Sequence, residues 1–223
     1  MISGKAAATC RSILGGASDH FMRMKSFAIV AALALSTAIS GCSTIGSQLF
    51  SNNYGSVNDA GYQLPRIPIE KVPLKYHRQE VNYDTSEKPG TIVVDTQNKF
   101  LYFVEGDGRA IRYGIGVGRE GFEWHGTAHI ALKREWPTWT PPRQMIQRQP
   151  ELAKFAGGME PGLKNPLGAR AMYLAGTLYR IHGSNEPETI GQAVSSGCFR
   201  MTNEDVVDLY DRVSVGATVI VRN

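Results

Sequence analysis

Two residues near the end of the chain have the chemistry of a nucleophile and its base. Cys198 carries a thiol, and His182, 16 positions earlier, carries an imidazole. A thiol becomes a strong nucleophile when a neighbouring imidazole lowers its pKa from about 8.5. Such a pair can take an acyl group from one amide, hold it covalently and yield it to another amine. The pair therefore predicts acyl transfer, with His182 accepting the thiol proton and passing it to the leaving amine.

The residues around Cys198 suit the same chemistry. Gly197 permits a tight backbone turn before the nucleophile, and the N–H groups of Gly197 and Cys198 are expected to bind the tetrahedral oxyanion. Arg200, two positions further on, is well suited to hold a substrate carboxylate by a bidentate hydrogen bond. Ser195 and Ser196 lead into this turn, and we expect both to contact the substrate.

Composition limits the alternatives. The chain has 223 residues, 42% of them hydrophobic, which leaves room for one domain after a leader is removed. Its net charge of +4 comes without a block of Lys and Arg, so a nucleic-acid partner is not supported. The other two cysteines, Cys10 and Cys42, lie in the N-terminal targeting region, which excludes a disulfide framework for the folded part. We expect no cofactor and no metal.

Short strands must position these residues. Apolar or alternating runs separated by glycine turns are typical of strands in a mainly β fold, a β-sandwich or barrel. His182 lies at the end of one such run, and Cys198 follows it after a polar loop. The expected strands cover residues 91–95, 99–104, 110–117, 127–133, 171–174, 177–182 and 217–221.

One helix is expected directly after the nucleophile. Thr202 can cap it, with Asp205 three residues later. Val206, Leu209 and Val213 then follow with helical spacing, so their face should pack on the sheet.

A long segment over residues 136–167 has no good strand pattern. It contains two tryptophans, several prolines and glycines, and a possible short helix. Loops of this length in compact domains are usually lids or binding loops, although a surface insertion packed by its own tryptophans is an equal alternative.

The N-terminal region has the features of an export signal. Arg23 and Lys25 precede an apolar run over residues 27–35, which is well short of the roughly 20 residues needed to span a bilayer. Small residues then lead to Cys42, in a pattern that resembles the lipobox of bacterial lipoproteins. We therefore expect a signal region over 1–41, lipidation at Cys42, a polar tether over 42–88 and the catalytic domain over 89–223. The expected location is the periplasm, anchored to a membrane of the cell envelope.

The segment from His182-Gly183 to Ser196-Gly197-Cys198 resembles the signature of the bacterial L,D-transpeptidases, and the resemblance extends from about residue 91 to 221. It implies an L,D-transpeptidase-like β fold, with the main-chain carbonyl of Gly183 orienting the imidazole. It also implies that the substrates are tetrapeptide stems of peptidoglycan, attacked at the diaminopimelate carbonyl with release of D-alanine. The family's usual histidine is replaced by Ser196, which puts substrate or pH preference in question.

Several functions remain open. The acceptor of the acyl group can be an amine of another stem peptide, an amine of an outer-membrane protein, or water. A metal-dependent hydrolase would use His125, His129 and His182 as ligands, but residues i and i+4 of a strand stand too far apart for easy joint ligation. A structural lipoprotein that binds peptidoglycan with an inactive site is the third alternative.

Overall fold

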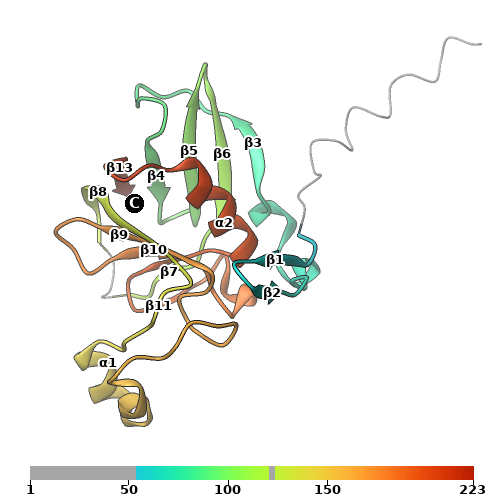
Figure 1. The fold of residues 1–223 in the computed structure, drawn as a ribbon. Helices are drawn as coiled ribbons and strands as arrows, with labels where there is room; N and C mark the ends of the chain where they lie inside the picture. The colour runs from blue at the N-terminus through green and yellow to red at the C-terminus, as the bar shows by residue number, and fades with distance from the viewer. Residues whose placement is uncertain (1–53, 121–123) are drawn as a thin grey trace, which may run out of the picture. The chain divides into compact units, whose positions relative to one another are not determined.

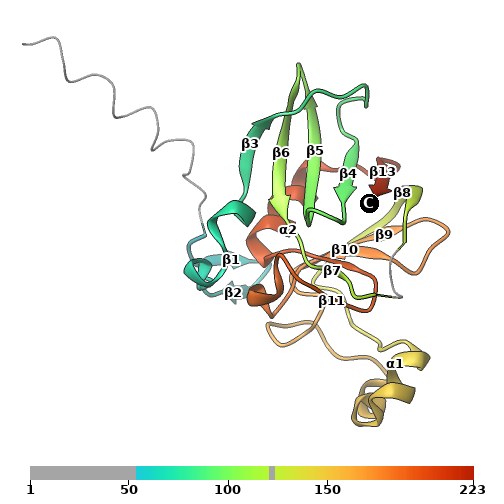
Figure 2. The ribbon, with the colours of Figure 1, turned by 180° about the vertical axis from the view of Figure 1, so that it is seen from behind.

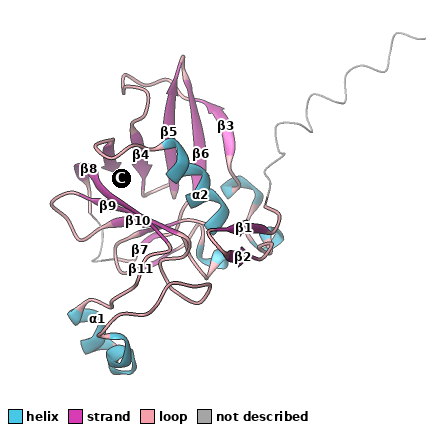
Figure 3. Cartoon of the chain, viewed as in Figure 1, coloured by secondary structure: helices cyan, strands magenta, loops and turns pink. Residues whose placement is uncertain are grey.

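A nine-stranded β-sheet dominates the part of the chain that the computed structural model describes, residues 54–120 and 124–223 (Figures 1 and 2). Its strands follow the order β12-β10-β9-β8-β13-β4-β5-β6-β3. Their bounds are β3 Gln79–Asn82, β4 Ile92–Asp95, β5 Phe100–Gly106, β6 Arg109–Gly114, β8 Gly126–Glu135, β9 Arg170–Leu174, β10 Arg180–His182, β12 Phe199–Arg200 and β13 Thr218–Arg222. Two small ladders pair β1 Val57–Asp59 with β2 Tyr62–Leu64, and β7 Val117–Gly118 with β11 Ala193–Ser195. The mainly β prediction is confirmed, since strands predominate and helices are few in the described ranges (Figure 3).

The centre of this sheet is buried on both faces. β4 has three consecutive buried residues, Ile92–Val94, because it pairs in parallel with β13 and antiparallel with β5. β8 instead alternates over residues 127–131, with Ala128 and Ile130 buried and the residues on either side of each exposed. The expected strand over 110–117 ends at Gly114, and its last residues leave the main sheet as β7 to pair with β11.

The expected helix after the nucleophile is present as α2, Asn203–Arg212. The Thr202 hydroxyl accepts a hydrogen bond from the Asp205 N–H at 3.1 Å, as an N-cap does. Val206 and Leu209 are fully buried in the main core cluster, so α2 packs its apolar face against the sheet.

The long segment over 136–167 contains α1, Arg143–Arg148, and a 3-10 helix, η3, Pro150–Phe155. Figure 1 shows this part extending away from the sheet. Asn165 closes its base: the side-chain amide donates to the carbonyls of Pro137, Met159 and Glu160, and its oxygen accepts from the Leu167 N–H. The segment is therefore a loop with a fixed base.

The expected tether requires a correction from Tyr54 onward. Residues 54–88 hold β1, β2 and β3, with two 3-10 helices, η1 Ile69–Lys71 and η2 Leu74–Tyr76. β3 pairs with β6 at the edge of the main sheet, and Leu64 and Tyr76 are buried. The structure of this segment was not predictable from its short, polar sequence. Its strands and helices are stabilised by partners far along the chain.

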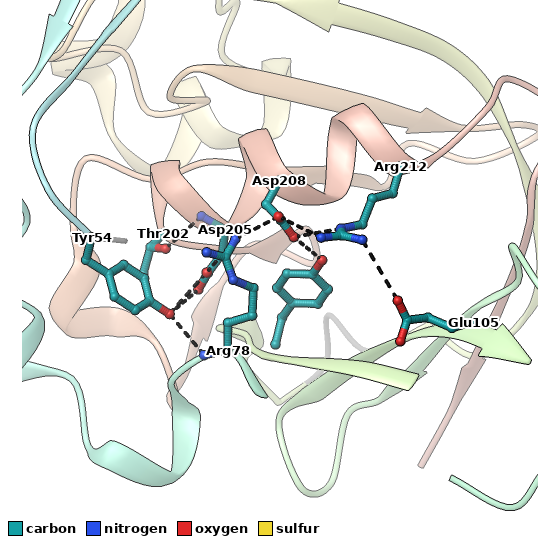
Figure 4. Close-up of polar contacts among 8 residues, drawn as sticks. Tyr54, Arg78, Glu105, Thr202, Asp205, Asp208 and Arg212 are labelled. Atoms are coloured by element: carbon teal, nitrogen blue, oxygen red, sulfur yellow. Dashed lines mark hydrogen bonds and ion pairs between the residues drawn. The ribbon is translucent and has the colours of Figure 1, made fainter. Parts of the chain in front are cut away.

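Charged contacts hold this N-terminal part in place. Asp59 receives two hydrogen bonds from the Arg170 guanidinium at 2.6 and 2.7 Å and one from the Trp136 indole at 2.8 Å. Tyr54 donates to Asp205 at 3.1 Å, and Arg78 pairs with Asp208 of α2 at 3.1 Å (Figure 4). Residues 54–88 are thus part of the folded unit.

The expected signal region and the Cys42 lipidation site lie outside the described residues. Among the residues that are described, no helix is long and apolar enough to cross a membrane.

Candidate active site

Two short parallel strands bring the expected catalytic residues to one face of the sheet. Ile181 of β10 lies beside Phe199 of β12, and both are buried in the core. Neighbours along a strand point to opposite faces, so the residues flanking this pair point away from the core. These are Arg180, His182, Cys198 and Arg200. From the strand spacing and rise, His182 and Cys198 are about 8 Å apart at Cα, one strand across and two residues along, so their side chains can approach.

His182 is held as a neutral base. Its Nδ1 lies 2.6 Å from the Gly183 carbonyl oxygen. Because a carbonyl only accepts, Nδ1 carries the proton and Nε2 keeps its lone pair. Burial lowers the pKa of His182 to about 3, against the Gly183 hydrogen bond, which raises it, and with the charges of Arg200 and Arg180, which lower it further. The imidazole is therefore uncharged near neutral pH.

Gly183 is required by close packing as well as by its carbonyl. A Cβ at this position would collide with Oδ1 of Asn203, at the start of α2. That oxygen also accepts the Ala169 N–H at 2.9 Å, so it cannot easily move. The Gly183 N–H donates to the Arg170 carbonyl at 3.0 Å. Asn203 is a site residue that the sequence analysis missed, because its contacts cross 34 positions of the chain.

Cys198 is partly exposed, and its sulfur lies close to Arg180. Burial raises the pKa of the Cys198 thiol, while the charge and hydrogen bonding of Arg180, and the charge of Arg200, pull it down. The net pKa is raised, so the thiol is protonated at rest. The site therefore rests as a neutral thiol and a neutral imidazole, not as a preformed ion pair.

The turn before Cys198 is held by Ser195. Gly197 has φ of 113°, a left-handed conformation that favours glycine. The Ser195 hydroxyl donates to the Cys198 carbonyl at 2.7 Å and accepts from the Gly197 N–H at 3.1 Å.

These bonds change two expectations. Ser195 is 2% exposed and serves the turn, so the structure does not support its expected substrate contact. The Gly197 N–H is engaged in the resting structure, which leaves the Cys198 N–H as the oxyanion donor to test. Ser196 is partly exposed, and its contact with the substrate stays a prediction.

Arg200 already has a carboxylate partner within the chain. Its guanidinium lies 2.7 Å from Oε2 of Glu186, which belongs to the loop after His182. That loop continues through the 3-10 helix η4, Pro187–Thr189. Glu186 is half exposed, so a substrate carboxylate that binds Arg200 must compete with it. Sequence spacing did not predict Glu186, since 14 positions separate the pair.

A cavity of about 740 Å³ opens beside the nucleophile turn. Gly197 and Phe199 belong to its wall, together with residues of the β4–β5 turn, β7 and the start of β8. Lys99 and His125 give this wall polar groups. The cavity adjoins the turn that carries Cys198, although neither Cys198 nor His182 belongs to its wall.

The metal alternative finds no support in the geometry. His125 and His129 are exposed, whereas His182 is buried with Nδ1 bound to Gly183. In the described parts of the chain, no three residues of the types that bind metals are grouped closely enough to hold an ion.

Comparisons with known proteins identify the family of this chain. Residues 89–221 match the sequence model of the L,D-transpeptidase catalytic domain. In Escherichia coli K12, the probable L,D-transpeptidase ErfK/SrfK is 38% identical over 162 residues, and the probable L,D-transpeptidase YbiS is 34% identical over 158. Each match covers 69% of this chain and 50% of the relative, so the chain spans about half the length of these curated relatives.

A crystal structure from Brucella melitensis, described as a probable carnitine operon oxidoreductase, is also similar. It is 50% identical, with a TM-score of 0.48, and the match covers 67% of this chain and 96% of that one. That description concerns the Brucella protein, whereas the family match here extends over more than half of this chain and includes both His182 and Cys198. The chain belongs to the L,D-transpeptidase family.

Proposed function

We propose that this chain is a peptidoglycan L,D-transpeptidase with Cys198 as its nucleophile. The observation that supports it most is the neutral His182, fixed by the Gly183 carbonyl on the same sheet face as Cys198. An imidazole held in this tautomer presents Nε2 as a base, which is what a protonated thiol needs. The donor substrate is a tetrapeptide stem, attacked at the carbonyl of its diaminopimelate residue.

The reaction proceeds through a thioester. The Cys198 thiol gives its proton to Nε2 of His182, and the sulfur forms a bond to the carbonyl carbon. The Cys198 N–H binds the resulting oxyanion. The C–N bond then breaks, and D-alanine leaves with the proton that His182 returns to its amine. An acceptor amine attacks the thioester, gives a proton to His182, and the proton returns to the sulfur as the new amide forms.

We propose two acceptors of the same chemistry. An amine of a second stem peptide would give a 3-3 crosslink, and an amine of an outer-membrane protein would attach that protein to the wall. Arg200 and Ser196 lie beside the nucleophile and are the proposed contacts for stem-peptide carboxylates and amides. The Glu186 ion pair must open for Arg200 to do this.

The decisive test follows products by intact mass. The chain from residue 44 onward is incubated with disaccharide-tetrapeptide, alongside Cys198→Ala, His182→Ala and an exposed control, Ser86→Ala. We expect crosslinked dimer with loss of D-alanine from the wild type and the control, and none from the other two. Tripeptide alone would show hydrolysis instead. No product and no carbapenem adduct on Cys198 would refute the enzyme and favour a binding protein.

A lipid anchor at Cys42 is a separate proposal that rests on the sequence. If it is right, the mature protein from envelope membranes begins at Cys42 and carries diacylglycerol, and Cys42→Ala removes the lipid mass. A mature protein that lacks lipid and begins elsewhere would refute it.

A further inference from the structure

Arg180 occupies a position that the proposed mechanism does not yet use. The parallel register continues from Ile181 beside Phe199 to place Arg180 beside Cys198, one strand away. Strand neighbours lie about 4.8 Å apart, so the two residues are adjacent on the face that carries the site. His182 lies two residues further along the same strand and points to the same side.

The surroundings of Arg180 direct its guanidinium without neutralising it. The guanidinium lies 5.4 Å from the ring centre of Tyr173, the residue opposite it on β9. Its Nε is buried and has no hydrogen-bond partner among the described residues. A buried, unsatisfied N–H costs roughly 1–3 kcal/mol, so a group that accepts from it would be stabilised.

Arg200 differs from Arg180 in having an ion-pair partner. Its charge is paired with Glu186 at 2.7 Å, whereas none of the ion pairs in the described ranges includes Arg180. Two arginines therefore flank one thiol, and of the two only Arg200 has a carboxylate partner within the described part of the chain. The unpaired charge of Arg180 has the greater effect on the electrostatic potential at the sulfur, because no neighbouring anion offsets it.

We propose that Arg180 stabilises the Cys198 thiolate during catalysis. The inference deepens the proposed function of the same site and rests on it for the identity of the substrate. When the thiol gives its proton to His182, negative charge appears on the sulfur beside the Arg180 guanidinium. Protonating the deeply buried imidazole is unfavourable. A fixed cation beside the sulfur stabilises the thiolate and so lowers the free energy of the proton transfer. The hydrogen bonding and charge of Arg180 that oppose the raised pKa of the thiol agree with this role.

The test measures the thiol itself and needs no peptidoglycan. The rate of Cys198 alkylation by iodoacetamide is followed against pH for the wild type, Arg180→Gln, Arg180→Lys and Arg109→Gln. Arg109 is exposed at the far end of β6, so its variant removes the same charge away from the site. An adjacent cation lowers the pKa of an acid by roughly one to three units. The midpoint of Arg180→Gln should therefore move up by about that amount, Arg180→Lys should move less, and Arg109→Gln should not move.

Two results would overturn the proposal. One is a folded Arg180→Gln variant, checked by its thermal unfolding, whose midpoint matches the wild type. The other is an Arg109→Gln variant that moves as far, since that would reduce the effect to net charge. If Arg180→Gln does not fold, Arg180→Met, which keeps the length of the side chain and removes its charge, carries the test, and an unchanged midpoint refutes the role. A shifted midpoint in a protein that makes no transpeptidation product would support Arg180 and reject the proposed function, so the two failures are separable.

Discussion

Replacing Asp59 with asparagine should weaken the whole fold, because it unpairs a buried arginine. The carboxylate of Asp59 makes a bidentate pair with Arg170, and the two side chains are 14% and 6% exposed. Burial alone would raise the pKa of Asp59, but the hydrogen bonds and charge of Arg170 and the Trp136 indole bring it below its ordinary value. The folded protein thus favours the ionised form, and the pair contributes stability.

The size of the stability loss depends on the contacts that Arg170 keeps once Asp59 is replaced. Its Nε has no partner among the described residues, and Glu135, the other carboxylate near it, is 4.0 Å away and more than half exposed. Removing one partner of a buried pair costs roughly 3–5 kcal/mol. Asp59 is not fully buried and asparagine can keep one hydrogen bond, so we expect about 3 kcal/mol. For a domain of this size that lowers Tm by roughly 6–12 °C.

Urea unfolding followed by circular dichroism measures this directly, with Asp84→Asn as the control. Asp84 is exposed and belongs to the same N-terminal part, so its variant should unfold like the wild type. The folded pKa of Asp59 is depressed, so its contribution is present above the unfolded value of 3.8 and is lost as pH falls through the folded pKa. The difference between wild type and Asp59→Asn should therefore be full at neutral pH and shrink in acid. A stability loss no larger than that of the control would refute the stabilising role of the Asp59–Arg170 pair.

Three further predictions concern α2 and the site. Both carboxylate oxygens of Glu204 are buried and have no hydrogen-bond partner among the described residues, and burial raises the pKa of Glu204 to about 7. The fold therefore loses stability as the pH rises from 4.5 to about 7, because the buried carboxyl group must then ionise. Glu204→Gln should stabilise the protein by about 3 kcal/mol at pH 8 and by little at pH 4, as measured by urea unfolding. Equal effects at both pH values would contradict this. Gly183→Ala should move the imidazole, because its Cβ meets Asn203, and reduce the rate of carbapenem acylation by roughly 100-fold; an unchanged rate would show that the packing yields. Ser195→Ala leaves the buried Gly197 N–H without its partner and should cost about 1–3 kcal/mol in urea unfolding, whereas Ser86→Ala should cost nothing.

Regular patterns made much of the fold predictable. β8 alternates buried and exposed residues and the central strand β4 is a continuous apolar run, so both were visible in the sequence. The Thr202 cap and the helical spacing after it predicted α2 for the same reason. In each case the signal lies within a few neighbouring residues.

The N-terminal hairpin had no such signal. β1 and β2 are three residues each, and what orders them is a contact between Asp59 and Arg170, 111 positions away. A polar segment with glycines and prolines is typical of a linker when such partners are unknown. The tether expectation failed from Tyr54 onward because short-range patterns do not report long-range pairs.

For the candidate site too, short-range sequence patterns predicted some residues and missed those with long-range contacts. Residue type and spacing indicated Cys198, His182 and Gly183. They gave no indication that Ser195 holds the turn or that Glu186 pairs with Arg200, because hydrogen bonding and ion pairing depend on where loops return. Arg180 could have been found from the sequence, since it lies two positions before His182 on an expected strand and so shares its face.

Arg170 connects the part that the sequence missed to the part that it found. Its guanidinium binds Asp59 of the N-terminal hairpin, while its main-chain carbonyl accepts the N–H of Gly183, whose own carbonyl orients His182. Strand β9, which begins with Arg170, is also the direct neighbour of β10. Three hydrogen bonds, through Arg170 and Gly183, therefore connect the N-terminal hairpin to the proposed base, His182. Although the family match begins at residue 89, the unit that fixes this imidazole begins no later than Asp59, and a fragment that starts at residue 89 should lose carbapenem acylation together with stability.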